Sequence, residues 1–338
     1  AWANGRGCRG GGERRLNDAP IREVESLRKN FGGITAVDGV SFTLETGKIT
    51  GLIGPNGAGK TTTFNLISGF YKPTSGTIRF NGTDTQEIMR PSSAERSIWT
   101  GASASSVGIL GLGAGRVLFG ASPGVLAGGA VVGAGAGIGL YLGQGAYRNR
   151  TESTKHSRPF QLAQRGMIRT FQITRELTEM TVLENLLLAP QGQMGENIVN
   201  AVVRRDAVAE DERQLREQAE EVIDLLELDH LRDEEAGNLS GGQRKLLELG
   251  RVLMLEPDLV LLDEPVAGVN PSLTDRIMDA ITSMRDEGYS FCIVEHEMDV
   301  IMEISDRIVA MAEGKKMAEG PPEEIQENQQ VLESYLGG

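Results

Sequence analysis

The chain has 338 residues, of which 39% are hydrophobic and 24% are charged. This length predicts two domains, or one large domain with an insertion, and the composition excludes a fully disordered chain or a fibrous repeat. The net charge of −13 argues against sequence-independent binding to nucleic acid, which needs a positive face, so we expect no nucleic-acid partner. Two cysteines and three histidines are too few for a disulfide framework or a histidine-rich metal cluster.

The first part of the chain predicts a leader and then a series of strands. Residues 1–20 contain no apolar stretch of the signal-peptide kind, and we expect a disordered leader there. Residues 21–27 and 40–44 alternate apolar and polar side chains, as half-buried strands do. Residues 48–54 are predicted to form a buried strand that runs into a glycine-rich loop, and a helix follows from Lys60 to Gly69.

After a further predicted strand at residues 76–80, the composition changes. We interpret residues 84–157 as an insertion, because residues 97–115 and 117–147 carry no charged side chain and are rich in glycine. Each uncharged run exceeds or approaches the roughly 20 residues that a helix needs to cross a bilayer. Glycines recur every fourth residue, as in closely packed membrane helices.

The second part of the chain alternates helices with buried strands. We predict strands at residues 258–262 and 290–294. Helices are predicted over residues 204–228, from Ser240 onward and over residues 271–284. Such alternation is typical of a largely parallel, doubly wound α/β sheet, in which the chemistry gathers at the carboxyl ends of the strands.

A phosphate-binding loop follows the strand at residues 48–54. Its sequence, GPNGAGKT, fits the pattern G-x-x-x-x-G-K-[ST] at every fixed position, between a predicted strand and a predicted helix. Glycines let backbone N–H groups turn toward phosphate oxygens, and the helix N-terminus adds partial positive charge. Lys60 adds a full positive charge, and the hydroxyl of Thr61 can reach a Mg²⁺ ion. The candidate nucleotide-binding residues here are Gly54, Pro55, Asn56, Gly57, Ala58, Gly59, Lys60, Thr61 and Thr62.

Two acidic residues follow the buried strand at residues 258–262. Asp263 comes directly after four apolar residues and is placed to face a Mg²⁺ ion beside the phosphate loop. Glu264 follows it and is placed to polarise a water molecule against a terminal phosphate.

The segment LSGGQ at residues 239–243, in order with these motifs, resembles the signature of ATP-binding-cassette (ABC) ATPases. The resemblance implies a P-loop NTPase cassette with a RecA-like core, an antiparallel β subdomain and an α-helical subdomain at residues 173–238. The cassette would span residues 21–338, interrupted by the insertion at 84–157. In this family the signature closes on ATP held by the other subunit, which assigns that role to Ser240, Gly241, Gly242 and Gln243.

Other family positions are identified individually from the same resemblance. Phe31 matches the aromatic residue that stacks on adenine, with a core phenylalanine as the alternative. Gln172 matches the glutamine that senses Mg²⁺ and the transmembrane partner, and His296 matches the histidine that contacts the γ-phosphate. Asn270 occupies the position where many cassettes have aspartate. This difference leaves undetermined how the two subunits of the dimer are coupled, but it does not affect the expected activity.

The resemblance implies ATP hydrolysis with ATP and Mg²⁺ bound. Glu264 would be the base or water-positioning group, with His296 and Gln172 completing the catalytic set. The metal ligands would be Thr61, Gln172 and Asp263. Most of the catalysis is then positioning and electrostatics, and an isolated monomer would be slow because half of each site is missing.

Finer features resemble the ATPase subunits of branched-chain amino-acid importers. They are RGMIRTFQITRELTEMTVLEN at residues 165–185, DEPVAGVNP at 263–271 and VLESYLGG at 331–338. The likeness covers about residues 22–83 and 158–338. It implies two transmembrane permease subunits, a second ABC ATPase subunit in a heterodimer, and an extracytoplasmic solute-binding protein. Two alternatives stay open: an importer for urea or short amides, and a non-transport ABC ATPase that acts as an assembly or regulatory module.

The implied location is peripheral, on the cytoplasmic face of the cell membrane. Because residues 22–83 and 158–338 must build one nucleotide site, a single membrane crossing by the insertion is excluded. Residues 97–147 would then form a two-pass membrane hairpin that tethers the subunit, a re-entrant or interfacial loop, or a soluble glycine-rich element.

Overall fold

The computed structural model describes residues 20–89, 159–170, 177–190, 193, 195 and 204–336. The chain divides into two units, one of residues 1–85 with 159–338 and one of residues 86–158. Residues 1–19 of the leader predicted at residues 1–20, and all of residues 97–147, lie outside the described residues. Among the described residues, no helix is long and apolar enough to cross a membrane.

Four strands form an antiparallel sheet in the order β2-β1-β4-β5. The first two strands form a long hairpin that is longer than the sequence pattern predicts, because the pairing continues to the Gly32-Gly33 turn. Gly32 takes a φ of +59° there, which suits glycine. The strands are β1 (Arg22–Phe31), β2 (Ile34–Leu44), β4 (Ser75–Phe80) and β5 (Thr83–Asp84).

Six strands form the second sheet, in the order β10-β9-β3-β8-β7-β6. All neighbouring pairs are parallel except β10 with β9, which confirms the predicted largely parallel sheet. Because β3, β8 and β7 are consecutive neighbours, their carboxyl ends lie side by side at one edge. The strands are β3 (Ile49–Ile53), β6 (Met167–Arg169), β7 (Leu259–Asp263), β8 (Ser290–Val294), β9 (Arg307–Ala312) and β10 (Lys315–Gly320).

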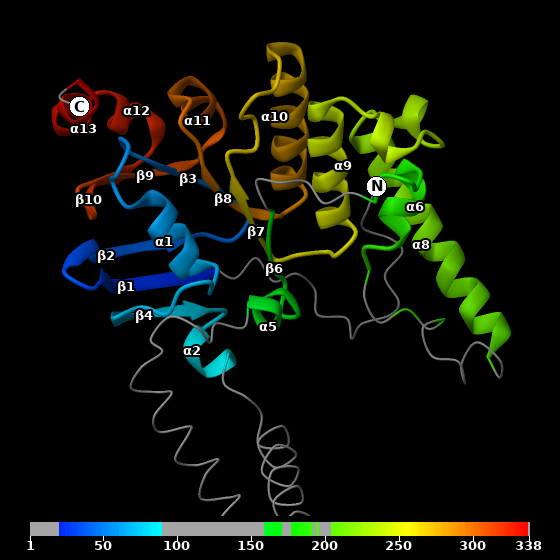
Figure 1. Cartoon of the computed structure of the whole chain (residues 1–338), viewed down its shortest axis with the longest axis horizontal. Helices are drawn as coiled ribbons and strands as arrows, with labels where there is room; N and C mark the ends of the chain where they lie inside the picture. Colours follow the sequence, from blue (N-terminus) through cyan, green and yellow to red (C-terminus); the bar gives the residue numbers. More distant parts are fainter. Residues whose placement is uncertain are drawn as a thin grey trace, which may run out of the picture. The chain divides into compact units, whose positions relative to one another are not determined.

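Helices surround this sheet, and Figure 1 shows α9 and α10 side by side next to β7. The short helix α2 (Thr85–Ile88) follows β5. The longer helices confirm the predicted amphipathic pattern, with Ala219 and Val222 buried on α8. The remaining helices are α1 (Lys60–Ile67), α5 (Pro159–Ala163), α6 (Val182–Leu187), α8 (Arg205–Leu225), α9 (Gly241–Leu253), α10 (Pro271–Asp286), α11 (Met298–Ile304), α12 (Pro322–Gln326) and α13 (Gln329–Leu336).

Helix α9 is held on two sides by close packing at glycine. A Cβ atom added to Gly242 would lie 1.9 Å from Cδ2 of Leu273 on α10. A Cβ atom added to Gly250 would lie 2.8 Å from Cδ1 of Leu226 and 3.0 Å from Cδ2 of Leu186. The glycines therefore let α9 approach both α10 and the α6–α8 pair, which places the start of α9 beside the carboxyl end of β7.

Candidate functional site

The phosphate loop between β3 and α1 has the backbone that its glycines allow. Gly54, Gly57 and Gly59 take φ angles of +151°, +80° and +92°. The loop closes on itself through the Ala58 N–H, which donates to the Pro55 carbonyl oxygen at 3.2 Å. Nothing lies within 4 Å of a Cβ atom added to Gly57, so this part of the loop is open.

Lys60 lies at the start of α1 with its ammonium group folded back into the loop. Its Nζ donates to the carbonyl oxygens of Gly54 at 2.6 Å and Pro55 at 3.1 Å. Burial lowers the pKa of Lys60, and the nearby Glu264 carboxylate acts in the opposite direction. The lysine is thus held inside the loop, with one buried positive charge where the terminal phosphates of a nucleotide would bind.

Phe31 is not a core residue: it is 37% exposed at the end of β1. Its ring packs edge to face against Tyr71, with 5.4 Å between ring centroids, and Nζ of Lys29 lies 5.1 Å from the Phe31 centroid. Lys29 is itself buried and donates to the Lys72 carbonyl oxygen at 2.8 Å. An exposed ring supported in this way provides a stacking surface for a base.

Asp263 at the end of β7 is paired with Arg169 at the end of β6. Nη2 of Arg169 lies 2.9 Å from Oδ2 of Asp263, and the two side chains are only 14% and 10% exposed. The guanidinium also donates to Asn65 at 2.5 Å and Ser68 at 3.1 Å, and stacks on Phe64 of α1. Arg169 therefore ties the helix of the phosphate loop to the carboxylate that the sequence predicts to face Mg²⁺.

Glu264 and His296 meet across the carboxyl ends of β7 and β8. Nε2 of His296 lies 3.0 Å from Oε1 of Glu264, and their side chains are 49% and 24% exposed, respectively. The Glu264 backbone has a φ of +50°, a left-handed conformation that is unusual for a residue other than glycine. Such strain gathers at functional sites when surrounding contacts hold it.

Two residues that the sequence patterns do not identify hold the segment after β7. The carboxylate of Glu295, 3% exposed, accepts from the N–H groups of Val266 at 3.0 Å and His296 at 3.1 Å. Burial raises the pKa of Glu295, and these backbone donors partly offset that effect. Nζ of Lys245 on α9 donates to the carbonyl oxygens of Ala267 at 2.7 Å and Glu264 at 3.3 Å. The contacts of these two side chains with the segment after β7 join residues far apart in sequence and involve main-chain groups of that segment, so no residue pattern marks them.

The signature segment forms the beginning of α9, as predicted. Ser240 is the N-cap, and its hydroxyl accepts from the Gln243 N–H at 3.3 Å. The Gln243 side chain accepts from the Ser240 N–H at 2.8 Å, which completes a capping box. Gly241 is exposed and nothing lies within 4 Å of its added Cβ atom, whereas Gly242 packs against α10.

Asn270 caps α10. Its side-chain oxygen accepts from the Leu273 N–H at 3.0 Å, and Pro271 occupies the first turn. Asparagine and aspartate are equally good N-caps. The replacement of aspartate by asparagine at this position therefore keeps the local fold. Gln172, the remaining predicted site residue, lies outside the described residues.

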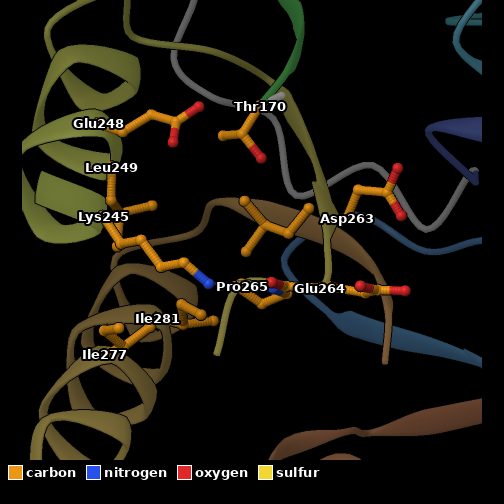
Figure 2. Close-up of a pocket in the computed structure, with 10 residues that line it drawn as sticks. Thr170, Lys245, Glu248, Leu249, Asp263, Glu264, Pro265, Ile277 and Ile281 are labelled. Carbon is orange, nitrogen blue, oxygen red and sulfur yellow. Dashed lines mark hydrogen bonds between the residues drawn. The ribbon is translucent and has the colours of Figure 1, made fainter. Parts of the chain in front are cut away.

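A small open pocket of about 40 Å³ lies between α9, α10 and the end of β7. Figure 2 shows Lys245 reaching from α9 toward Pro265, with Ile277 and Ile281 of α10 below it. The carboxylates of Asp263 and Glu264 point away from Lys245 in this view. Lys245 and His296 thus approach Glu264 through different groups, one at its backbone carbonyl and one at its carboxylate.

Comparison with known proteins agrees with this geometry. The sequence matches the family described as ABC transporter over residues 37–105 and 143–267. Residues 315–338 match the family described as branched-chain amino acid ATP-binding cassette transporter.

Curated relatives are similar over nearly the whole chain. The chain is 35% identical to a probable branched-chain amino acid transport ATP-binding protein LivG of Archaeoglobus fulgidus, covering 94% of this chain and 95% of that protein. It is 32% identical to the high-affinity branched-chain amino acid transport ATP-binding protein BraF of Pseudomonas aeruginosa, covering 94% and 98%. It is 31% identical to LivG of Escherichia coli, with the same coverage.

Solved structures share the fold. A nucleotide-free ATP-binding cassette from an ABC transporter superposes with a TM-score of 0.61 at 29% identity, covering 95% of this chain and 100% of that one. The ADP conformation of an ATP-binding cassette of an ABC transporter superposes with a TM-score of 0.62, at the same identity and coverage. The chain therefore belongs to the ABC transporter family, as one of its ATP-binding cassettes.

Proposed function

We propose that this chain is the ATP-hydrolysing subunit that energises an importer of branched-chain amino acids. The observation that carries the ATPase part is the 3.0 Å contact between His296 and Glu264, next to the phosphate loop that holds Lys60. The relatives, which are branched-chain amino acid transport ATP-binding proteins at 31–35% identity, support the transport part. The match of residues 315–338 to a branched-chain cassette family supports it as well.

In the proposed reaction a water molecule attacks the γ-phosphorus of ATP in line with the bond to the bridging oxygen, which leaves with ADP. Glu264 positions this water and accepts its proton, and His296 fixes the Glu264 carboxylate and donates to a γ-phosphate oxygen. Lys60 and the backbone N–H groups of residues 54 and 56–62 bind the phosphates. Phe31 stacks on the adenine. These groups act by positioning and by charge stabilisation.

The donor set fits Mg²⁺. Thr61, exposed at the start of α1, offers a hydroxyl and Asp263 offers a carboxylate, which are hard oxygen ligands of the kind that this ion prefers. Gln172, outside the described residues, would add an amide oxygen. When bound, the ion neutralises charge on the phosphate oxygens. Arg169 keeps the Asp263 carboxylate oriented at the end of β7.

Activity needs a second cassette under this proposal. Ser240, Gly241, Gly242 and Gln243 would close on ATP held by the other subunit, and the second cassette would be a related chain in a heterodimer. Two transmembrane permeases and an extracytoplasmic solute-binding protein would complete the importer. The chain would then lie peripherally on the cytoplasmic face of the cell membrane.

A first experiment tests the ATPase site. Glu264→Gln should lower ATP turnover by about a hundredfold or more while ATP affinity stays within about twofold. The exposed Glu333 on α13 supplies the control, and Glu333→Gln should turn over ATP at the wild-type rate. Equal turnover by wild type and Glu264→Gln would refute the proposed role of Glu264.

A second experiment tests transport. The Glu264→Gln chain, trapped with ATP, should recover two permeases and a second cassette from native membranes in mild detergent. The complex rebuilt in vesicles with its solute-binding protein should hydrolyse ATP faster when leucine, isoleucine or valine is added. Stimulation by urea or short amides instead would change the solute class, and recovery of soluble proteins alone would refute transport.

A further inference from the structure

The turn that follows β7 is held by contacts on two sides. The Glu264 N–H still donates to the Val294 carbonyl oxygen at 2.8 Å, so β7 and β8 remain paired up to this residue. The chain then enters the left-handed region at φ +50°, and the Ala267 N–H donates back to the Glu264 carbonyl oxygen at 3.2 Å. A side chain other than glycine is held in such a conformation only where neighbours over-determine it.

Lys245 is the side chain that reaches the carbonyl oxygen of this strained residue. Its ammonium group donates to Glu264 at 3.3 Å and to Ala267 at 2.7 Å, so it spans both ends of the turn. The lysine lies on the second turn of α9, the helix whose N-cap is the signature residue Ser240. Gly242, packed against α10, keeps α9 close enough for this reach.

The surroundings of Lys245 differ from those of a lysine on an open protein surface. Burial lowers the pKa of Lys245, while the nearby carboxylates of Glu295, Glu248 and Glu264 act against that effect. Glu295 fixes the same turn from the other side through the Val266 N–H. The turn is thus held at Glu264, Val266 and Ala267 by two side chains from different elements.

We propose that Lys245 is a positioning residue for Glu264: its ammonium group holds the backbone that aims the glutamate carboxylate at His296 and the attacking water. This inference rests on the proposed catalytic role of Glu264. Without the ammonium group, two carbonyl oxygens lose a charged donor and the left-handed turn can relax toward an ordinary conformation. The carboxylate then leaves its aligned position while the phosphate loop stays intact.

The main test separates the turnover number from nucleotide binding. In the full chain, Lys245→Met should lower the kcat of ATP hydrolysis by about tenfold to a hundredfold, as misplacement by about 1 Å does elsewhere. The Kd for ATP should stay within about twofold. Lys245→Arg, whose several donors can reach the same carbonyls, should retain about half of the kcat or more. Lys315→Met, at an exposed lysine on β10, is the control with unchanged kcat.

A measurement besides activity follows the turn directly. Hydrogen–deuterium exchange of the amides of residues 264 and 266–269 should be faster in Lys245→Met than in wild type, and unchanged in Lys315→Met. Exchange in α1 and the phosphate loop should not change in either variant. Should Lys245→Met fail to fold, Lys245→Gln, which keeps one donor group, replaces it with the same readouts.

The double variant Lys245→Met with Glu264→Gln separates failure of this inference from failure of the proposed function. Its residual turnover should equal that of Glu264→Gln alone, because the lysine acts through the glutamate. Wild-type kcat in Lys245→Met, with Glu264→Gln inactive, would overturn the role of Lys245 and leave the proposed function standing. A kcat loss that persists in the Glu264→Gln background, or a loss of ATP affinity, would show that Lys245 acts elsewhere.

Discussion

The guanidinium of Arg169 and the carboxylate of Asp263 form an ion pair that is almost enclosed, with 2.9 Å between Nη2 and Oδ2. The same guanidinium stacks on the rings of Phe64 and Phe70 at 4.7 and 4.9 Å. Arg169 closes β6, and Asp263 closes β7 beside it. One side chain therefore joins the helix that follows the phosphate loop to the acidic end of the neighbouring strand.

Removal of this guanidinium should destabilise the fold. Arg169→Met leaves the carboxylate of Asp263 without its cation, and we expect the free energy of unfolding to fall by about 3 kcal/mol. Urea unfolding of the variant and the wild type, with EDTA present, measures this change in the free energy of unfolding. Arg213→Met, at an exposed arginine paired with Glu210 and Glu217 on α8, should lower the free energy of unfolding far less, because solvent screens an exposed pair. Equal losses in the two variants would contradict a structural role for the enclosed pair.

Two glycines of the phosphate loop should respond differently to alanine. Gly57 has open space around an added Cβ atom, whereas at Gly59 that atom would lie 2.6 Å from the Ala36 carbonyl oxygen. Both have positive φ, which costs alanine about 1–2 kcal/mol. Gly57→Ala should therefore show only this cost, together with weaker ATP binding. Gly59→Ala should lose clearly more stability, and thermal unfolding of both variants gives the comparison.

Glu295 should make stability depend on pH. Its pKa is raised by burial above the ordinary value of 4.5. A raised folded-state pKa means that the favourable contribution is complete below 4.5 and is lost as the pH rises through the raised value. Compared with Glu295→Gln, the wild-type chain should thus be relatively most stable at the acid end and lose that advantage as the pH increases. Urea unfolding of both chains between pH 4.5 and 8 measures the difference, with Glu333→Gln as the exposed control. A difference that stays constant with pH would contradict the assignment.

Phe31 should contribute to nucleotide affinity through its exposed ring. Phe31→Ala should raise the Kd for ATP by about tenfold, since stacking of a base on an aromatic ring is worth roughly 1–3 kcal/mol. Phe31→Trp should retain the affinity because the stacking surface is kept. Ile34→Ala, at a 72% exposed residue across the same turn, should leave the Kd unchanged. Fluorescence titration with a labelled ATP analogue distinguishes these outcomes.

The sequence by itself determined the fold class and the family, and it identified the candidate residues of the site. Residues 54–61 fit a pattern in which each position has a chemical reason, and the strands before Asp263 and His296 are short apolar runs bounded by polar residues. Such signals are local, so they can be recognised without knowing the partners of each residue. Local patterns do not set the length of a strand. The pattern predicts a strand at residues 21–27, but β1 continues to Phe31 because pairing with β2 determines where it ends.

Only the tertiary structure decided how the turn after β7 is held. Lys245 and Glu295 are 19 and 31 residues from Glu264, and both bind main-chain groups. Any residue can present a carbonyl oxygen or an N–H group, so nothing in the composition of the turn marks these partners. The pairing of Arg169 with Asp263 depends in the same way on β6 lying beside β7, which is a property of strand order. Local chemistry therefore identifies the candidate site residues, and long-range packing determines which side chains hold the backbone around them.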